Sequence, residues 1–172
     1  MRGLREYLGL PLVLIHAEKF TGGVLFMKRS AVLAVVVALF AATMAFGAVQ
    51  DFGKFTVDVA AGWTATQQGP TASFTKDDNT AAMSITADSA QGNSAKALAD
   101  AFVENFKGSF ASVSAPEVDE DGDYSWDMVN AQGVNTHAML HVEDGDYILI
   151  TMTGLEAAAD DIQAMLGSLK DK

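Results

Sequence analysis

Met128, His137 and Met152 are the side chains in this sequence that could together hold a soft metal ion. Thioether and imidazole groups suit Cu(I), and a chain without cysteine would have to use them. If the strands pair as described below, the three side chains are neighbours across adjacent strands, about 5 Å apart at each step. The other interpretation is packing, because methionine fills irregular gaps in cores and ligands on one flat sheet face converge poorly on an ion. The sequence favours packing and leaves a Cu(I) site as the alternative.

Acidic side chains crowd the segment 117–127, and Asp-Gly-Asp-Tyr occurs twice, at 121–124 and 144–147. Carboxylate oxygens suit Ca²⁺, but the spacing does not match a helix–loop–helix calcium site. Counted from Asp119, glycine takes the fourth position instead of the sixth, and Asn130 stands where a bidentate Glu is needed. Asp-Gly pairs are typical of tight turns before strands. The sequence therefore favours two turns, with weak calcium binding at the loop tips as the alternative.

The search for catalytic chemistry gives no motif. The sequence has no nucleophile elbow, phosphate-binding loop, dinucleotide fingerprint or zinc-protease helix. His137 and His141 are four residues apart, which on a strand separates them by about 13 Å and prevents a shared ion or a catalytic dyad. We therefore predict a non-enzymatic protein with no catalytic residues and no bound cofactor.

The overall charge excludes one large class of partner. The 172 residues include 11 basic and 22 acidic side chains, a net charge of −11. Phosphate binding needs a basic surface, so we expect no nucleic-acid partner. The absence of cysteine also excludes disulfides, a thiol nucleophile and thiolate metal sites.

Residues 27–48 have the layout of a secretory signal peptide: Met-Lys-Arg, an uncharged apolar run, and small residues for cleavage after Gly47 or Ala48. An uncleaved membrane anchor is the alternative. We expect translation to begin at Met27, with residues 1–26 a mis-called upstream segment. The exported product would be one domain, 49–172, periplasmic or secreted by a bacterium and without a stable membrane anchor. It would keep six of the 11 basic and 20 of the 22 acidic residues, a net charge of −14.

The first half of this domain predicts strands followed by a helix. Alternating or turn-bounded apolar residues indicate strands over 55–60, 63–67, 71–76 and 80–87. The period then changes, and apolar residues recur every four positions between an Asn93-Ser94 cap and a stop at Gly108.

The second half repeats this order. Strands are expected over 124–130, 135–143 and 147–153, and Pro116 limits 113–118 to an edge piece. A second helix would begin at a Thr153/Glu156 capping box, with an apolar stripe of Leu155, Ile162, Leu166 and Leu169. The fold class is therefore α+β, an antiparallel sheet with two amphipathic helices.

Two-residue turns at Gln132-Gly133 and Asp144-Gly145 would set the register of the last three strands. One sheet face would then carry the rows Tyr124/His141/Ile148, Trp126/Met139/Ile150 and Met128/His137/Met152. The other face would carry the more polar set Ser125, Asp127, Thr136, Leu149 and Thr151. We expect a helix to cover the first face, and a slip of one residue would overturn this arrangement.

The strand and turn Phe55-Thr-Val-Asp-Val-Ala-Ala-Gly-Trp63 resembles the entry strand of PsbP-like domains, although Ala61 stands where that pattern often has Pro. The order of elements from Phe52 to Leu169 is also similar to their αβα sandwich. The resemblance implies binding and assembly instead of catalysis, and bacterial members without an assigned activity. We therefore expect an acidic module that binds a protein of the cell envelope, with a periplasmic metal-handling protein, for Cu(I) or weakly bound calcium, as the alternative. The sequence fixes no oligomeric state.

Overall fold

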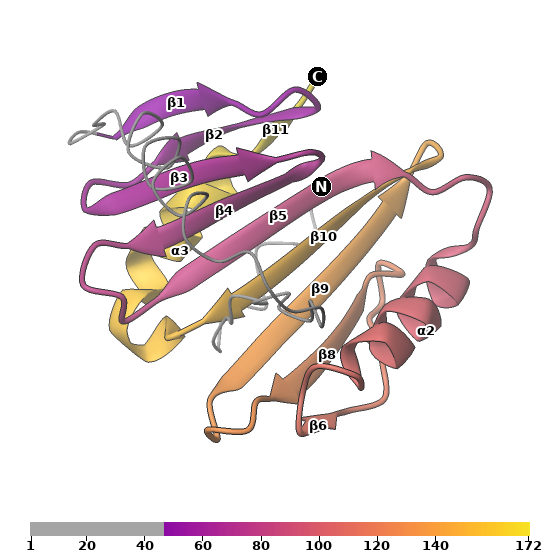
Figure 1. Ribbon diagram of the computed structural model, residues 1–172. Helices are drawn as coiled ribbons and strands as arrows, with labels where there is room; N and C mark the ends of the chain where they lie inside the picture. Colours follow the sequence, from indigo (N-terminus) through magenta and orange to yellow (C-terminus); the bar gives the residue numbers. More distant parts are fainter. Residues whose placement is uncertain (1–46) are drawn as a thin grey trace, which may run out of the picture.

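The computed structural model describes residues 47–172, so the predicted upstream segment and the body of the predicted signal peptide lie outside the described residues. Figure 1 shows a curved antiparallel sheet with a smaller sheet beside one end and a helix on each face. The elements, in chain order, are β1 (Ala48–Asp51), β2 (Phe55–Val59), β3 (Trp63–Gln68), β4 (Thr71–Lys76), β5 (Ala82–Ser89), α2 (Ala95–Phe106), β6 (Ser112–Val113), β7 (Glu117–Val118), β8 (Tyr124–Val129), β9 (Asn135–Glu143), β10 (Asp146–Thr153), α3 (Leu155–Ser168) and β11 (Lys170–Asp171).

Two sheets divide these strands. The large sheet has the order β3-β4-β5-β10-β9-β8-β6, with β7 also paired to β8, and the small sheet has the order β1-β2-β11. All pairs are antiparallel. The predicted α+β class is therefore confirmed, and the expected edge piece is present as β6 and β7 on either side of Pro116.

Helix α2 begins where the sequence predicts. The Ser94 side chain accepts a hydrogen bond from the Ala97 amide and caps the first turn. The helix buries Ala99, Val103 and Phe106 against the sheet, where they form a core with Trp126 and Leu140. Leu149 of β10 completes the same face of the sheet.

Helix α3 covers the opposite face, together with the small sheet. Its Ile162 and Met165 are fully buried in a second core with Phe55 of β2, Met83 of β5 and Ile150 of β10. Successive residues of β10 therefore contribute alternately to the two cores, because neighbouring side chains on a strand point to opposite faces of the sheet. None of the helices within residues 47–172 is both long and apolar enough to cross a membrane.

The predicted capping box of α3 is wrong. Gly154 precedes the helix with φ +71° and ψ 28°, and no side chain caps the first turn. The Thr153 hydroxyl is buried without a hydrogen-bond partner in the described structure, so it does not perform the capping role. A glycine is required here because a Cβ at position 154 would lie 1.9 Å from the Thr80 carbonyl oxygen.

The predicted register is confirmed between β9 and β10 and wrong by one residue between β8 and β9. Ile148 pairs with His141, and Met152 with His137, as expected. Trp126, however, pairs with Ala138, and Asp127 pairs with His137.

The cause of the slip is the loop after β8. Asn130 hydrogen-bonds Val134 across a three-residue loop, and its side-chain oxygen accepts from the Gln132 and Val134 amides. Gly133, with φ +79°, closes this loop. Because one extra residue turns a strand over, Tyr124, Trp126 and Met128 face α2, together with Thr136, Leu149 and Thr151.

Candidate functional site

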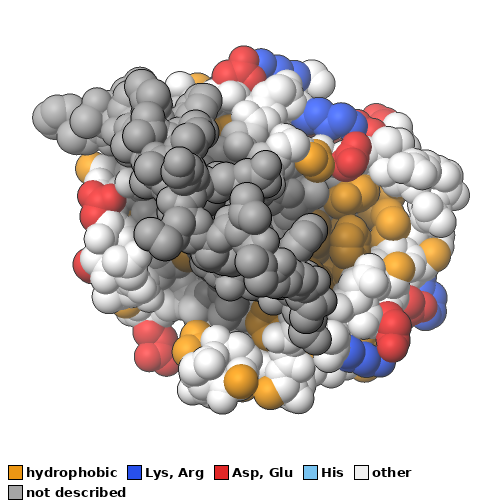
Figure 2. Space-filling view, viewed as in Figure 1, with side chains coloured by type: hydrophobic (Ala, Val, Ile, Leu, Met, Phe, Trp, Pro, Cys, Tyr) orange, Lys and Arg blue, Asp and Glu red, His pale blue; other side chains and the backbone are white. Residues whose placement is uncertain are grey.

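Most of the lysine side chains in the described part of the chain are paired with carboxylates of the same chain. Residues 47–172 contain six lysines and no arginine, against 20 carboxylate side chains. Five of the lysines form ion pairs within the chain: Lys54–Asp146, Lys76–Asp161, Lys96–Asp100, Lys107–Glu104 and Lys172–Asp51. On the face shown in Figure 2 the lysine side chains lie beside acidic ones. The carboxylates in excess therefore set the sign of the surface potential.

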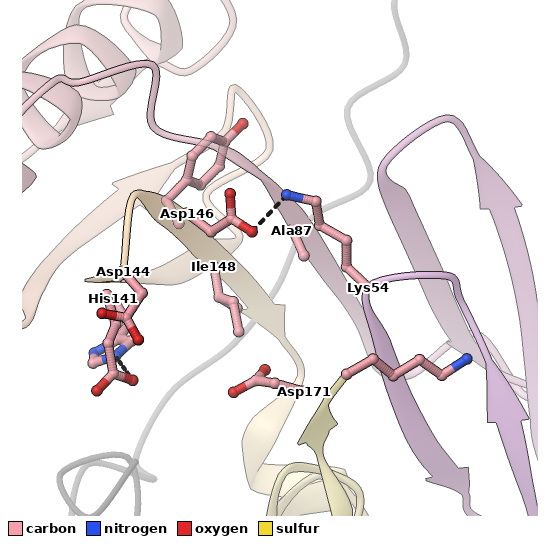
Figure 3. A pocket seen from close by; sticks show the side chains of 10 residues that line it. Lys54, Ala87, His141, Asp144, Asp146, Ile148 and Asp171 are labelled. Atoms are coloured by element: carbon pink, nitrogen blue, oxygen red, sulfur yellow. Dashed lines mark hydrogen bonds and ion pairs between the residues drawn. The ribbon is translucent and has the colours of Figure 1, made fainter.

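A cavity of about 220 Å³ lies where the turn between β9 and β10 approaches the C-terminal strand β11. Ala87 and Ile148, which pair across β5 and β10 and are almost fully buried, supply its apolar wall. Acidic side chains from the hairpin and from β11 surround this wall (Figure 3). They are Glu143, Asp144, Asp146 and Asp171, and the basic groups of the lining are Lys54, Lys172 and His141.

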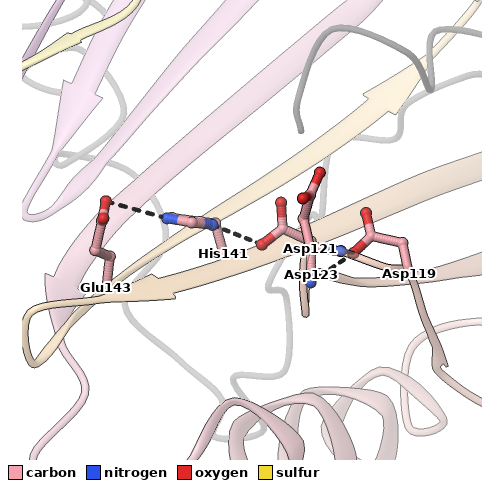
Figure 4. A network of polar contacts seen from close by, with 5 residues as sticks. All are labelled: Asp119, Asp121, Asp123, His141 and Glu143. Atoms are coloured by element: carbon pink, nitrogen blue, oxygen red, sulfur yellow. Dashed lines mark hydrogen bonds and ion pairs between the residues drawn. The ribbon is translucent and has the colours of Figure 1, made fainter. Parts of the chain in front are cut away.

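In the lining of the cavity, His141 joins two carboxylates in a chain of hydrogen bonds (Figure 4). Its Nδ1 lies 2.6 Å from Asp123 Oδ1, and its Nε2 lies 3.4 Å from Glu143 Oε2. Carboxylates only accept hydrogen bonds, so a histidine with a carboxylate at each nitrogen is best satisfied when both nitrogens carry protons.

The electrostatics of His141 agree with this geometry. Burial of the imidazole opposes its protonation, but the hydrogen bonds and charges of Asp123 and Glu143 outweigh burial and raise the pKa of His141 above 6.5. When protonated, His141 places a positive charge between these two anions. Neither of its nitrogens is left free to act as a general base, which requires a lone pair directed at a substrate.

A short loop between β7 and β8 positions Asp123. Asp119 Oδ1 accepts hydrogen bonds from the amides of Asp121 and Asp123, both at 2.9 Å, and Gly122 takes a positive φ of +89°. These contacts leave the Asp123 side chain only 11% exposed against His141. The acidic segment 117–123 is therefore held to the end of the β9–β10 hairpin.

The two Asp-Gly-Asp-Tyr segments are turns. Asp144 and Gly145 both have positive φ, 51° and 86°, and link Glu143 to Asp146 as a two-residue hairpin turn. In the first segment the Asp119 carboxylate serves backbone amides. Within residues 47–172, no three His, Asp or Glu side chains converge as a metal site.

The three proposed soft-metal ligands do not lie on one face. His137 and Met152 are paired across β9 and β10, but the corrected register places Met128 on the α2 face. His137 Nδ1 lies 2.9 Å from Asp127 Oδ1, while its Nε2 is buried with no hydrogen-bond partner in the described structure. Beyond Met152, Met83 of β5 continues the row.

Trp63, at the end of the strand that resembles PsbP-like domains, belongs to a second polar cluster. Its indole nitrogen donates to Asp161 Oδ2 at 3.0 Å, and Lys76 Nζ lies 2.6 Å from the same oxygen. The hydrogen bonds from Lys76 and Trp63 hold the pKa of Asp161 below its usual range. This cluster ties α3 to β3 and β4, so we interpret it as structural.

The sequence reasoning missed the cavity. Its lining comes from positions 54, 87, 141, 143, 144, 146–148 and 171–172, and no local motif links them. The doubled Asp-Gly-Asp-Tyr segment was the one signal that pointed to this end of the sheet.

Comparison with known proteins identifies the fold of this chain. No family model matches the chain, and no curated protein matches it. Among solved structures, the solution structure of cyanobacterial PsbP (CyanoP) from Synechocystis sp. PCC 6803 matches with a TM-score of 0.50 and 9% identity, over 77% of this chain and 96% of that one. A crystal structure from Bacteroides thetaiotaomicron VPI-5482 matches with a TM-score of 0.41 and 14% identity, over 75% of this chain and 49% of that one. The antiparallel sheet between two helices and the likeness to CyanoP together show that this chain has a PsbP-like fold.

Proposed function

We propose that residues 49–172 form a non-enzymatic, exported module that binds a basic segment of another protein in the bacterial cell envelope. The observation that carries this proposal is the charge arrangement: five of six lysines are paired within the chain, and most of the 20 carboxylates are left over. Such a surface repels anionic membranes and nucleic acid and attracts Lys- and Arg-rich segments.

The acidic loop at 117–121 and the turn at Asp144 are the favoured contact region. The loop is tied to β9 through Asp123 and His141, so both segments lie at one end of the large sheet. Exposed acidic side chains on a fixed loop give a partner a defined charge pattern without the entropic cost of ordering a mobile one. The PsbP-like fold is compatible with this function and contributes no residue to it.

Photo-crosslinking in cells that naturally contain the protein tests this proposal. A crosslinking amino acid at Glu120, exposed in the acidic loop, should give a discrete adduct with a protein whose contacting segment is rich in Lys or Arg. The same amino acid at Thr66, exposed on the distant edge strand β3, should give none. No adduct at Glu120, or equal adducts at both positions, would contradict the proposal.

Export has a separate test. The sequence predicts cleavage after Gly47 or Ala48, so mass spectrometry of the protein from fractionated cells should find an amino terminus at Ala48 or Val49 in the periplasmic or secreted fraction. A peptide from residues 7–19 in that fraction would contradict both the cleavage and the start at Met27.

A second candidate function is the handling of a soft metal ion. The buried, unpartnered Nε2 of His137 next to Met152 favours it, because imidazole and thioether are Cu(I) ligands. A Cu(I) competition titration should show weaker binding in His137→Gln and Met152→Leu. Met128→Leu is the matched control, since Met128 lies on the other face of the sheet and its substitution should leave affinity unchanged. Equal affinities in all four proteins would contradict this candidate.

A further inference from the structure

We propose that the cavity between the β9–β10 turn and β11 receives one arginine or lysine side chain of the partner. This inference rests on the proposed binding of a basic segment and assigns the point at which that segment is anchored.

The size of the cavity limits its occupant. Its volume of about 220 Å³ is below the roughly 300–1,000 Å³ of pockets for drug-sized ligands and cofactors. A single long side chain is therefore a better match than a nucleotide or another cofactor. The cavity also adjoins the acidic loop, because His141, in its lining, contacts Asp123 at the end of that loop.

The charges of the lining favour a cation. Four carboxylates face two lysines and His141, and all three basic groups are engaged. Lys54 lies 2.7 Å from Asp146, and Lys172 pairs with Asp51, which is not part of the lining. His141 contacts Asp123 and Glu143. Within residues 47–172, Asp144 and Asp171 have no ion pair. An incoming ammonium or guanidinium group would form ion pairs with these two carboxylates. An anion would instead have to displace a carboxylate from one of the lysines.

The apolar wall favours a cation with an aliphatic stem. Ala87 is 6% exposed and Ile148 is 9% exposed, so they offer a small apolar surface between charged groups. In Figure 3 the Ile148 side chain lies between Asp144 and Asp171. Arginine and lysine cover apolar surface with their methylene groups while the charged end stays among polar partners. Arginine suits the site better, since its planar group can bind two carboxylates at once.

The probe for this test is a pentapeptide with blocked ends and one arginine between alanines. It is titrated into the protein in the form isolated from cells, and binding is followed through the NMR signals of Ile148 and Ala87. We expect saturable shifts with the arginine peptide and none with the same peptide carrying citrulline, a neutral isostere. Asp144→Asn combined with Asp171→Asn should weaken binding at least tenfold. Asp58→Asn combined with Asp160→Asn, which removes two exposed carboxylates outside the cavity, should change it less than twofold.

Equal binding of the citrulline peptide, or wild-type affinity in the cavity variant with an unchanged melting temperature, would overturn the inference. Free arginine that binds as tightly as the peptide would also overturn it, because the occupant would then be a small molecule. The two proposals fail separately. A Glu120 adduct that persists unchanged in the cavity variant overturns the anchor and leaves the binding function standing. Peptide binding at the cavity without any Glu120 adduct overturns the binding function.

Discussion

At the scale of single residues, His141 is the side chain that joins the parts of the candidate site. It lines the cavity, contacts Glu143 on its own strand and holds Asp123 at the base of the acidic loop. The contact with Asp123 spans 18 residues of sequence and involves side chains that are 21% and 11% exposed. A change in the charge of His141 is therefore a change in how firmly the acidic loop is attached to the sheet.

The stability of the fold should depend on the protonation of His141. Its pKa is raised in the folded protein, so its contribution is fully present below the unfolded pKa of about 6.5 and is lost as pH rises through the folded pKa. Urea unfolding between pH 5.5 and 8.5 should show wild type losing stability with rising pH, and His141→Gln should remove much of that loss. His137→Gln serves as the control and should retain it. A pH profile that is the same in His141→Gln and wild type would show that the link to Asp123 is not energetically significant.

Trp126 should be essential to the core under α2. It is 2% exposed, and its ring centroid lies 6.3 Å from that of Phe106. Truncation of a buried aromatic typically costs about 3–5 kcal/mol, so Trp126→Ala should lower the urea midpoint strongly. Val118→Ala, at an exposed edge position, should stay within about 0.5 kcal/mol of wild type. A small effect of Trp126→Ala would mean that α2 does not pack on this face.

At the scale of elements, the sequence correctly predicted the strands, the helix start and the turn that depend on nearby residues in the chain. Alternation located β2 to β5 and β8 to β10, Ser94 located the start of α2, and Asp144-Gly145 gave the correct hairpin turn. The β8–β9 loop was misread because Gln132-Gly133 fits a two-residue turn equally well on paper. The deciding hydrogen bonds come from the side chain of Asn130, which the pairing rule does not count.

Elements that depend on distant contacts were not predictable in this way. Strands β1 and β11 have four and two residues, and both form only by pairing with β2, from opposite ends of the domain. The cavity depends on the same contact, since Asp171 reaches it through β11. Short strands carry too little periodicity for a pattern to detect. The site therefore followed from the assembled sheet and not from a motif.

The start of α3 gives a prediction at this scale. Gly154→Ala should destabilise the fold, because the left-handed backbone alone costs roughly 1–2 kcal/mol for a residue with a Cβ and the contact with the Thr80 carbonyl adds to it. Gly167→Ala is the matched control near the other end of the helix, where a Cβ meets open space, and should stabilise by about 0.5–1 kcal/mol. Thermal unfolding of both variants measures the pair. Equal effects of the two substitutions would contradict the conclusion that the N-cap position of α3 requires a glycine.

At the scale of the whole molecule, one sheet separates two cores and carries a large excess of negative charge. The α2 core and the α3 core share no residue, since alternate residues of β9 and β10 serve opposite faces. The two apolar cores work against the mutual repulsion of the carboxylates. The excess that weakens the compact state is also what would attract a basic partner.

Added salt should therefore stabilise this fold. At about 0.01 M ionic strength charges act over roughly 30 Å, which spans the domain, and at 1 M over roughly 3 Å, which removes long-range repulsion. Salt also weakens ion pairs, but both side chains of four of the five lysine pairs are at least 44% exposed, and exposed pairs contribute little stability. Repulsion should dominate, so the urea midpoint should rise between 10 mM and 500 mM NaCl at pH 7.5. Glu120→Gln combined with Asp121→Asn lowers the negative charge by two and should reduce the rise. A midpoint that falls with salt would mean that the local ion pairs, and not the excess of carboxylates, dominate the electrostatics of this surface.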